Sequence, residues 1–114
     1  MSAASTIGAA QVADAAPLFA ALGDETRLRL LLRLAAGGPE SITHLSAESA
    51  VSRQAITKHL DVLSRAGLIR GDRRGREHIW EIEPKRFAEA SDYLERISRQ
   101  WDDALGRLKR FVEE

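Results

Sequence analysis

Residues 51–76 decide the fold of this chain, and they read VSRQAITKHLDVLSRAGLIRGDRRGR. Ser52 is a good N-cap, because its hydroxyl can accept a hydrogen bond from an amide in the first turn of a helix. Gly67 stands where a helix end needs a left-handed backbone. Between them, Ile56, Leu60 and Leu63 recur at helical spacing and leave a polar stripe on the opposite side. The stretch therefore predicts an amphipathic helix that runs into a basic hairpin.

A shorter helix is expected just before this one. Ser41 can cap it, and Ile42 and Leu45 would lie on its apolar side. Two helices joined by a tight turn of about three residues form a helix-turn-helix unit, here at about residues 41–67. In such a unit the second helix presents its first turns to the major groove of DNA. The predicted DNA-contacting residues of this helix are Ser52, Arg53, Gln54, Thr57 and Lys58.

A β-hairpin is expected at about residues 68–83. Leu68 and Ile69 begin one strand, Trp80 and Ile82 alternate with Glu81 in the next, and a glycine stands between the strands. Such a hairpin is the wing of a winged helix-turn-helix fold. Its tip is rich in guanidinium groups, which suit phosphates or a narrow minor groove. The predicted wing contacts to DNA are Arg73, Arg74 and Arg76.

The formal net charge of zero hides an uneven distribution. Residues 51–78 carry seven basic and three acidic side chains, residues 1–50 carry three and five, and residues 79–114 carry seven and nine. The segment expected to contact DNA therefore has a net charge of +4, and each flank has −2. Concentrated positive charge attracts phosphate groups and releases their counterions, which favours nucleic acid as the partner.

The last predicted element is a long helix at about residues 84–113, which begins at Pro84. From Phe87 to Phe111, apolar residues recur in alternating steps of three and four, the pattern of a helix that packs on another helix. A helix of about 28 residues spans roughly 42 Å, more than a small domain covers with its own core. Part of the stripe should therefore face a second copy of the chain. The predicted dimerisation residues are Phe19, Leu94, Ile97, Trp101, Leu105 and Leu108.

The chain as a whole fits one domain. Residues 1–13 are expected to be a flexible tail, and residues 14–114 a single winged helix-turn-helix domain. Pro17 is expected to begin a short helix that ends at Gly23, and Asp24 to cap a second helix that stops at residues 37–39. The expected fold is mainly α, with about five helices and a two-stranded wing.

Several other classes of protein do not fit this sequence. Zero cysteines exclude disulfides and thiolate metal sites. No apolar run approaches the roughly 20 residues of a membrane span, and the first residues lack the features of a secretion signal, so we expect a cytoplasmic protein with no membrane partner. No nucleophile with its base, phosphate-cradling loop or converging carboxylate pair is recognisable. We therefore expect no enzymatic activity and no cofactor.

The spacing of the three histidines along the sequence does not match that of a metal site. His44, His59 and His78 belong to three different predicted elements, and the short ligand spacing typical of zinc sites is absent. His59 falls beside the apolar side of its helix and is expected to be a hydrogen-bonded packing residue. The sequence therefore predicts no bound metal.

Two stretches resemble the ArsR-type family of winged-helix repressors. Residues 19–31 (FAALGDETRLRLL) are similar to the family's opening motif, and residues 52–60 (SRQAITKHL), with Leu63 and residues 66–69 (AGLI), to its recognition helix. The resemblance covers nearly the whole chain. It implies a homodimer, formed through the first and last helices, that binds an inverted-repeat operator and represses transcription. Residues 74–78 and the tryptophan of the last helix further resemble a cysteine-free branch of the family.

The metal-sensing part of the family description does not transfer to this chain. Residues 43–48 (THLSAE) hold no cysteine where metal-sensing members carry it, and the last helix has no histidine. Two alternatives remain open from the sequence. One is a sensor of the same fold that responds to a metal ion or an unidentified small-molecule effector. The other is a winged-helix module that binds protein rather than DNA, which would show no steep loss of DNA affinity with salt.

Overall fold

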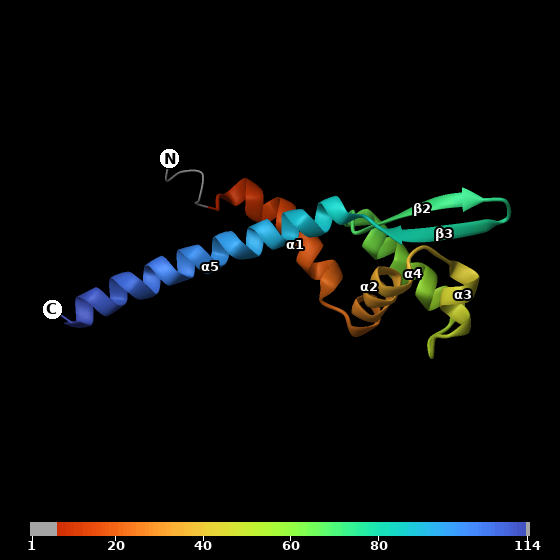
Figure 1. Ribbon diagram of the computed structural model, residues 1–114, viewed down its shortest axis with the longest axis horizontal. Helices are drawn as coiled ribbons and strands as arrows, with labels where there is room; N and C mark the ends of the chain where they lie inside the picture. Colours follow the sequence, from red (N-terminus) through yellow and green to blue (C-terminus); the bar gives the residue numbers. More distant parts are fainter. Residues whose placement is uncertain (1–6, 114) are drawn as a thin grey trace.

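The computed structural model describes residues 7–113 and confirms a mainly helical winged helix-turn-helix fold (Figure 1). Five helices and three strands follow one another along the chain. They are α1 (Ala9–Leu22), α2 (Glu25–Gly37), β1 (Glu40–Ser41), α3 (Ile42–Ala47), α4 (Arg53–Arg65), β2 (Ile69–Arg74), β3 (Glu77–Ile82) and α5 (Pro84–Glu113).

The sheet has one strand more than the sequence predicted. β2 and β3 form the expected antiparallel hairpin, and β1 adds to the other edge of β3, with Glu40 opposite Trp80 and Ser41 opposite Ile79. A strand of two residues is too short to show a period of two, so the pattern could not reveal it. β1 joins the wing to α3, because Ser41 also caps that helix.

One hydrophobic core lies between the helices and the base of the wing. Its fully buried side chains come from α1, α2, α3, α4 and the turn just before β2, and they are Leu18, Leu34, Leu45, Ile56, Leu60, Leu63 and Leu68. Burying a leucine or isoleucine side chain contributes about 1.5–3 kcal/mol. The apolar side of α4 is therefore fixed against the core, and its polar side is left facing outward.

The predicted helix ends around α4 are confirmed. The Ser52 hydroxyl oxygen accepts a hydrogen bond from the Ala55 amide at 3.1 Å. At the other end Gly67 has φ +80°, and the amide of Leu68 donates to the carbonyl of Leu63 at 3.0 Å. These features define a Schellman motif, in which glycine takes the left-handed position at no steric cost. The motif turns the chain directly from α4 into the wing.

The start of α1 differs from the prediction. Pro17 does not begin this helix but lies inside it, and the helix begins at Ala9. Residues 9–13 were expected to be flexible, but they form its first turns. Residues 9–16 include five alanines, which have the highest helix propensity and outweigh the hydrogen bond lost at proline. Residues 1–6 of the expected tail lie outside the described residues.

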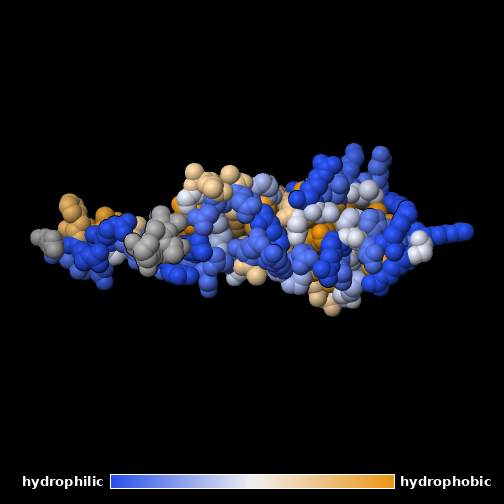
Figure 2. All heavy atoms as spheres, turned by 90° about the horizontal axis from the view of Figure 1, so that it is seen from above, coloured by the Kyte–Doolittle hydropathy of each residue, from blue (hydrophilic) through white to orange (hydrophobic). Residues whose placement is uncertain are grey.

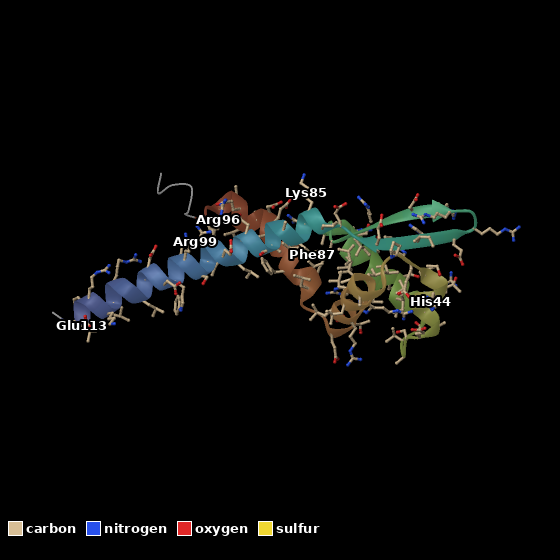
Figure 3. The ribbon with its side chains drawn as sticks, viewed as in Figure 1. His44, Lys85, Phe87, Arg96, Arg99 and Glu113 are labelled. Carbon is tan, nitrogen blue, oxygen red and sulfur yellow. The ribbon has the colours of Figure 1, made fainter. Side chains whose placement is uncertain are left out.

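The molecule is elongated because α5 extends beyond the body. The longest dimension is 67 Å, against 28 and 22 Å in the other directions. Beyond Arg99 the helix runs away from the other elements to Glu113 (Figure 3). The projecting end carries hydrophobic side chains, whereas the wing at the opposite end is hydrophilic (Figure 2). Within residues 7–113, no helix combines the length and the apolar character that a membrane span requires.

Candidate nucleic-acid interface

The predicted DNA-contacting residues of α4 lie together on its exposed side. Ser52, Arg53, Gln54, Thr57 and Lys58 are all exposed, while Ile56, Leu60 and Leu63 of the same helix are fully buried. These five residues occupy the N-terminal cap and first turns, the part of a recognition helix that reaches base edges. The amides at this end also favour an anion through the helix dipole.

Local hydrogen bonds hold part of this surface in place. Arg53 Nη1 donates to Thr43 Oγ1 of α3 at 3.3 Å, and the Thr57 hydroxyl donates to the carbonyl of Arg53 at 2.9 Å. The Ser52 oxygen accepts the capping hydrogen bond, which leaves its hydroxyl hydrogen free to donate to a phosphate. Gln54 and Lys58 have no such restraint from a described neighbour and extend from the exposed side of α4.

Arg27 of α2 fixes the position of α4, a role that the sequence reasoning missed. Its Nε and Nη2 donate to the carbonyls of Ala21 and Ala20 at 2.7 and 3.2 Å, and its Nη1 lies 3.3 Å from Nδ1 of His59. Since a guanidinium can only donate, the imidazole nitrogen accepts this hydrogen bond. The prediction that His59 is a hydrogen-bonded packing residue is therefore confirmed.

Asp24, the N-cap of α2, also takes part in this contact between α2 and α4. Its carboxylate accepts a hydrogen bond from the Arg27 amide at 3.0 Å and lies 3.8 Å from His59 Nδ1. The hydrogen bond from the Arg27 amide, assisted by the nearby charge of the Arg27 guanidinium, lowers the pKa of Asp24 below its usual value despite partial desolvation. The carboxylate thus stays ionised beside the start of α2.

The wing has two chemically different faces, set by the register of its strands. Residues directly opposite each other in an antiparallel pair share a face. The face that includes the buried Ile69 and the core-packed Trp80 and Ile82 is here called the inner face, and the other the outer face. The inner face consists of Ile69, Gly71, Arg73, His78, Trp80 and Ile82. The outer face consists of Arg70, Asp72, Arg74, Glu77, Ile79 and Glu81.

This division separates the three predicted wing arginines. Arg73 lies on the inner face opposite His78, whereas Arg74 lies on the outer face with its Nε 3.6 Å from Asp72. Arg76 belongs to the two-residue turn at the tip. On the outer face Arg70 also donates to Glu81 at 2.9 Å, and this hydrogen bond raises the pKa of Arg70. The outer face is therefore largely self-neutralised.

The predicted dimerisation residues of α5 are exposed along its length. Leu94, Trp101 and Leu108 are 53, 64 and 58% exposed, and Ile97 and Leu105 lie between them in the same stripe. Phe19, by contrast, packs against Tyr93 of its own chain, with ring centroids 5.6 Å apart. The stripe is a large apolar surface that the single chain leaves in contact with water.

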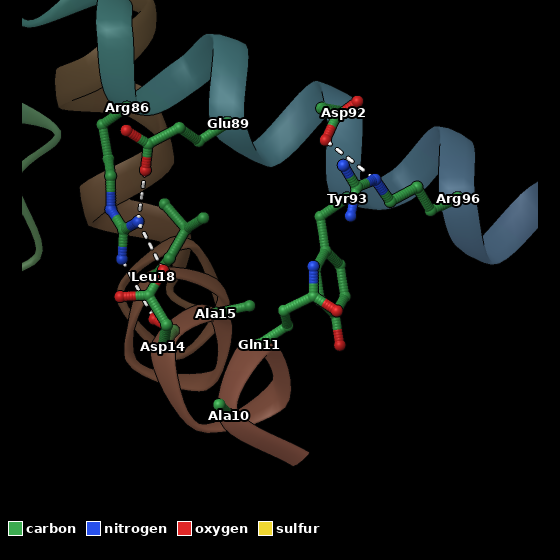
Figure 4. A pocket seen from close by; sticks show the side chains of 10 residues that line it. All are labelled: Ala10, Gln11, Asp14, Ala15, Leu18, Arg86, Glu89, Asp92, Tyr93 and Arg96. Carbon is green, nitrogen blue, oxygen red and sulfur yellow. Dashed lines mark hydrogen bonds and ion pairs between the residues drawn. The ribbon is translucent and has the colours of Figure 1, made fainter. Parts of the chain in front are cut away.

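A cleft of about 320 Å³ separates α1 from α5 (Figure 4). Arg86 donates to Asp14 at 3.2 Å and to Glu89 at 2.7 Å, and Arg96 pairs with Asp92 at 3.1 Å. Both arginines of the cleft are thus paired with its own acids, Asp14, Glu89 and Asp92, and leave no unpaired cation for a ligand among its lining residues. Its hydrogen bonds instead tie α5 to α1.

The Arg86 side chain also reaches the end of α4. Its Nε donates to the carbonyl of Ala66 at 3.0 Å, and its hydrogen bond to Glu89 raises the pKa of Arg86. In residues 7–113, no group of three or more His, Asp or Glu side chains is arranged to hold a metal ion.

Comparisons with known proteins agree with this architecture. A family model described as a helix-turn-helix domain matches residues 22–72. The HTH-type transcriptional regulator Rv2034 of Mycobacterium tuberculosis is 34% identical over 93 residues, which cover 82% of this chain and 83% of that protein.

Solved structures show the same similarity. An ArsR-like transcriptional regulator from Rhodococcus sp. RHA1 superposes with a TM-score of 0.81 and 36% identity, over 90% of this chain and 95% of that one. The AntR antimony-specific transcriptional repressor superposes with a TM-score of 0.62 and 26% identity, over 95% of this chain and 88% of that one.

Proposed function

Because this chain belongs to the ArsR-type family of winged helix-turn-helix transcriptional regulators, we propose that it represses transcription as a homodimer bound to an inverted-repeat operator. Members of this family are DNA-binding regulators, and so is this chain. The similarity to AntR, which is named as a repressor, supports repression as the outcome of binding.

The observation that carries the proposal is the exposed polar side of α4 beside the basic wing. In this proposal Gln54 bonds adenine through two hydrogen bonds, and Arg53 or Lys58 meets the acceptors of guanine. Thr57 contacts a thymine methyl group or a phosphate. The remaining predicted residues position the protein on the backbone through phosphate contacts, and they are Ser52, Arg73, Arg74 and Arg76.

A second copy of the chain explains the exposed stripe on α5. At about 25 cal/mol per Å² of apolar surface, covering Leu94, Ile97, Trp101, Leu105 and Leu108 would stabilise a dimer substantially. The two-fold symmetry of such a dimer would place two recognition helices on one side of the duplex, in major grooves about 34 Å or a multiple of that apart. An inverted-repeat operator matches this symmetry.

The experiment that tests the proposal uses DNA from upstream of the gene that encodes the chain. Purified protein should retard such a fragment and protect two symmetric half-sites, and its affinity should fall steeply as salt rises from 50 to about 200 mM. A protein that bound every sequence equally, or none, would contradict the proposed function. Reporter expression from the same fragment, with and without the protein, then separates repression from activation.

A further inference from the structure

His78 is an exposed residue of the wing that the proposed DNA contacts leave out. It lies opposite Arg73 in the register of β2 and β3, so the two side chains share the inner face. We infer that His78, together with Arg73, contacts the phosphodiester backbone of DNA, and that Trp80 and Gly71 hold the imidazole in place for this contact. The inference rests on the proposed function, because it adds a residue to the same DNA interface.

The first support is the stacking of His78 on Trp80. The two ring centroids are 4.3 Å apart and the ring planes differ by 24°. Trp80 is half-buried and packs against the hydrophobic core, so it forms a fixed platform. A side chain that is held before binding loses less conformational entropy when it contacts a ligand. The stack therefore presents the His78 ring in a defined position.

The second support is Gly71, which lies opposite Trp80 in β2. A Cβ atom at Gly71 would overlap Nε2 of His78 and lie 3.0 Å from Cζ3 of Trp80. The backbone does not itself require glycine, since positive φ occurs only at Gly38, Gly67 and Gly75 among the described residues. Glycine also weakens a strand. The space it leaves for the imidazole is thus the structural reason for glycine at this position.

The third support is the distribution of charge between the two faces. All three acids of β2 and β3 lie on the outer face, so no carboxylate of the hairpin competes for Arg73 and His78. Glu40 of β1 does lie opposite Trp80, but its carboxylate is held by Arg33 at 2.8 Å and by His44 at 2.9 Å. Arg73 and His78 on the inner face are therefore not neutralised by the acids of the hairpin and are open to an anion.

The inner face also lies on the same side of the sheet as the helices. The helices α2, α3 and α4 pack against the sheet on the side of Trp80 and Ile82, and the hairpin continues past α3 toward its tip (Figure 1). His78 is two residues closer to the tip than Trp80, beyond the core. When α4 enters a major groove, the backbone that borders this groove would pass beside the inner face.

Three variants test the inference. His78→Ala should weaken binding about 3- to 10-fold on operator and on random DNA alike, because a phosphate contact carries no sequence information. Gly71→Ala should cause a similar loss without a change of charge, because the new methyl group displaces the imidazole. The double variant should bind no more weakly than His78→Ala. His78→Lys should recover most of the affinity, and Ile79→Val on the outer face is the control that should bind like the wild type.

A direct measurement separates a DNA contact from a purely structural role. The chain has three histidines, so the imidazole signals can be assigned in NMR spectra by substituting each in turn. Adding a short duplex should shift the signals of His78. The signals of His59, which lies between α4 and α2 in contact with Arg27, should not change. Circular dichroism establishes that each variant is folded.

The outcomes distinguish this inference from the proposed function. Wild-type protein that binds DNA with a steep salt dependence, alongside a folded His78→Ala variant of equal affinity and an unshifted His78 signal, would overturn the inference alone. Wild-type protein that binds no DNA would overturn the proposed function itself. Loss of affinity in His78→Ala with full affinity in Gly71→Ala would show that the stack on Trp80 does not position the ring.

Discussion

The guanidinium of Arg27 spans from α2 to the recognition helix, with Nη1 3.3 Å from Nδ1 of His59. The same side chain donates to the carbonyls of Ala20 and Ala21 at the end of α1. One residue thus connects α1, α2 and α4. The placement of the proposed DNA-contacting surface relative to the rest of the body depends on this connection.

Replacing Arg27 with methionine should destabilise the fold. Met keeps much of the side-chain volume but leaves the Ala21 carbonyl and the His59 nitrogen without the Arg27 donor, and the Ala20 carbonyl with only the Gly23 amide. The free energy of unfolding should therefore fall by about 1.5–3 kcal/mol. Urea denaturation measures this change. Arg29→Met is the matched control, because Arg29 is 76% exposed and its pair with Glu25 should contribute less than about 0.5 kcal/mol. Equal losses in the two variants would contradict the role assigned to Arg27.

Asp24 should make stability depend on acid pH. Its pKa in the folded state lies below the ordinary value of 3.8, because the Arg27 amide donates to the ionised carboxylate. The stabilisation is therefore complete above the unfolded-state pKa and is lost as the pH falls through the folded-state pKa. Denaturation midpoints measured below about pH 5 should decline less steeply in Asp24→Asn than in the wild type. A parallel decline in both proteins would show that other carboxylates dominate the acid transition.

The helix ends were predictable because their causes are local. Ser52 and Gly67 act on amides and carbonyls within a few residues, so the chemistry is visible in a short stretch of sequence. The start of α1 was not predictable in this way. Pro17 is a typical first residue of a helix, but the alanine-rich segment before it is itself helical.

The interactions between elements could not be predicted in the same way. Arg27 and His59 are 32 residues apart, and only the packed fold brings them together. The division of the wing arginines depends on the register of β2 and β3, which a shift of one residue would invert. From sequence, Arg73 and Arg74 were equivalent members of a basic tip; in the fold they lie on opposite faces.

The apolar stripe on α5 gives a prediction about assembly. Trp101→Ala or Leu94→Ala should shift the protein from dimer to monomer and reduce operator affinity, because a single half-site binds weakly. Sedimentation velocity at micromolar concentration measures the assembly state. Arg99→Ala, on the opposite side of the helix, is the control and should remain dimeric. An unchanged dimer in both stripe variants would refute the assignment of this surface.

The two faces of the wing give a prediction about its arginines. Arg73→Ala should weaken binding to any duplex more than Arg74→Ala, because Arg74 lies on the outer face beside Asp72. Both variants should reduce affinity without changing base preference, since both side chains are expected to meet phosphate. The salt dependence of binding, compared between the two variants, measures how many phosphate contacts each one loses. A larger loss for Arg74→Ala would place the outer face toward the DNA.

Gln54 should determine base preference rather than overall affinity. Gln54→Ala should weaken operator binding by about 1–3 kcal/mol while leaving binding to random DNA nearly unchanged, because the side chain is exposed at the start of α4, the part of the helix proposed to read base edges. Lys58→Ala should behave similarly. Competition between operator and random duplexes measures the difference. Arg65→Ala is the control, since Arg65 lies in the last turn of α4 and pairs with Asp61 at 3.1 Å. Equal losses on both duplexes would assign Gln54 to the phosphate backbone and leave sequence reading to its neighbours on the helix.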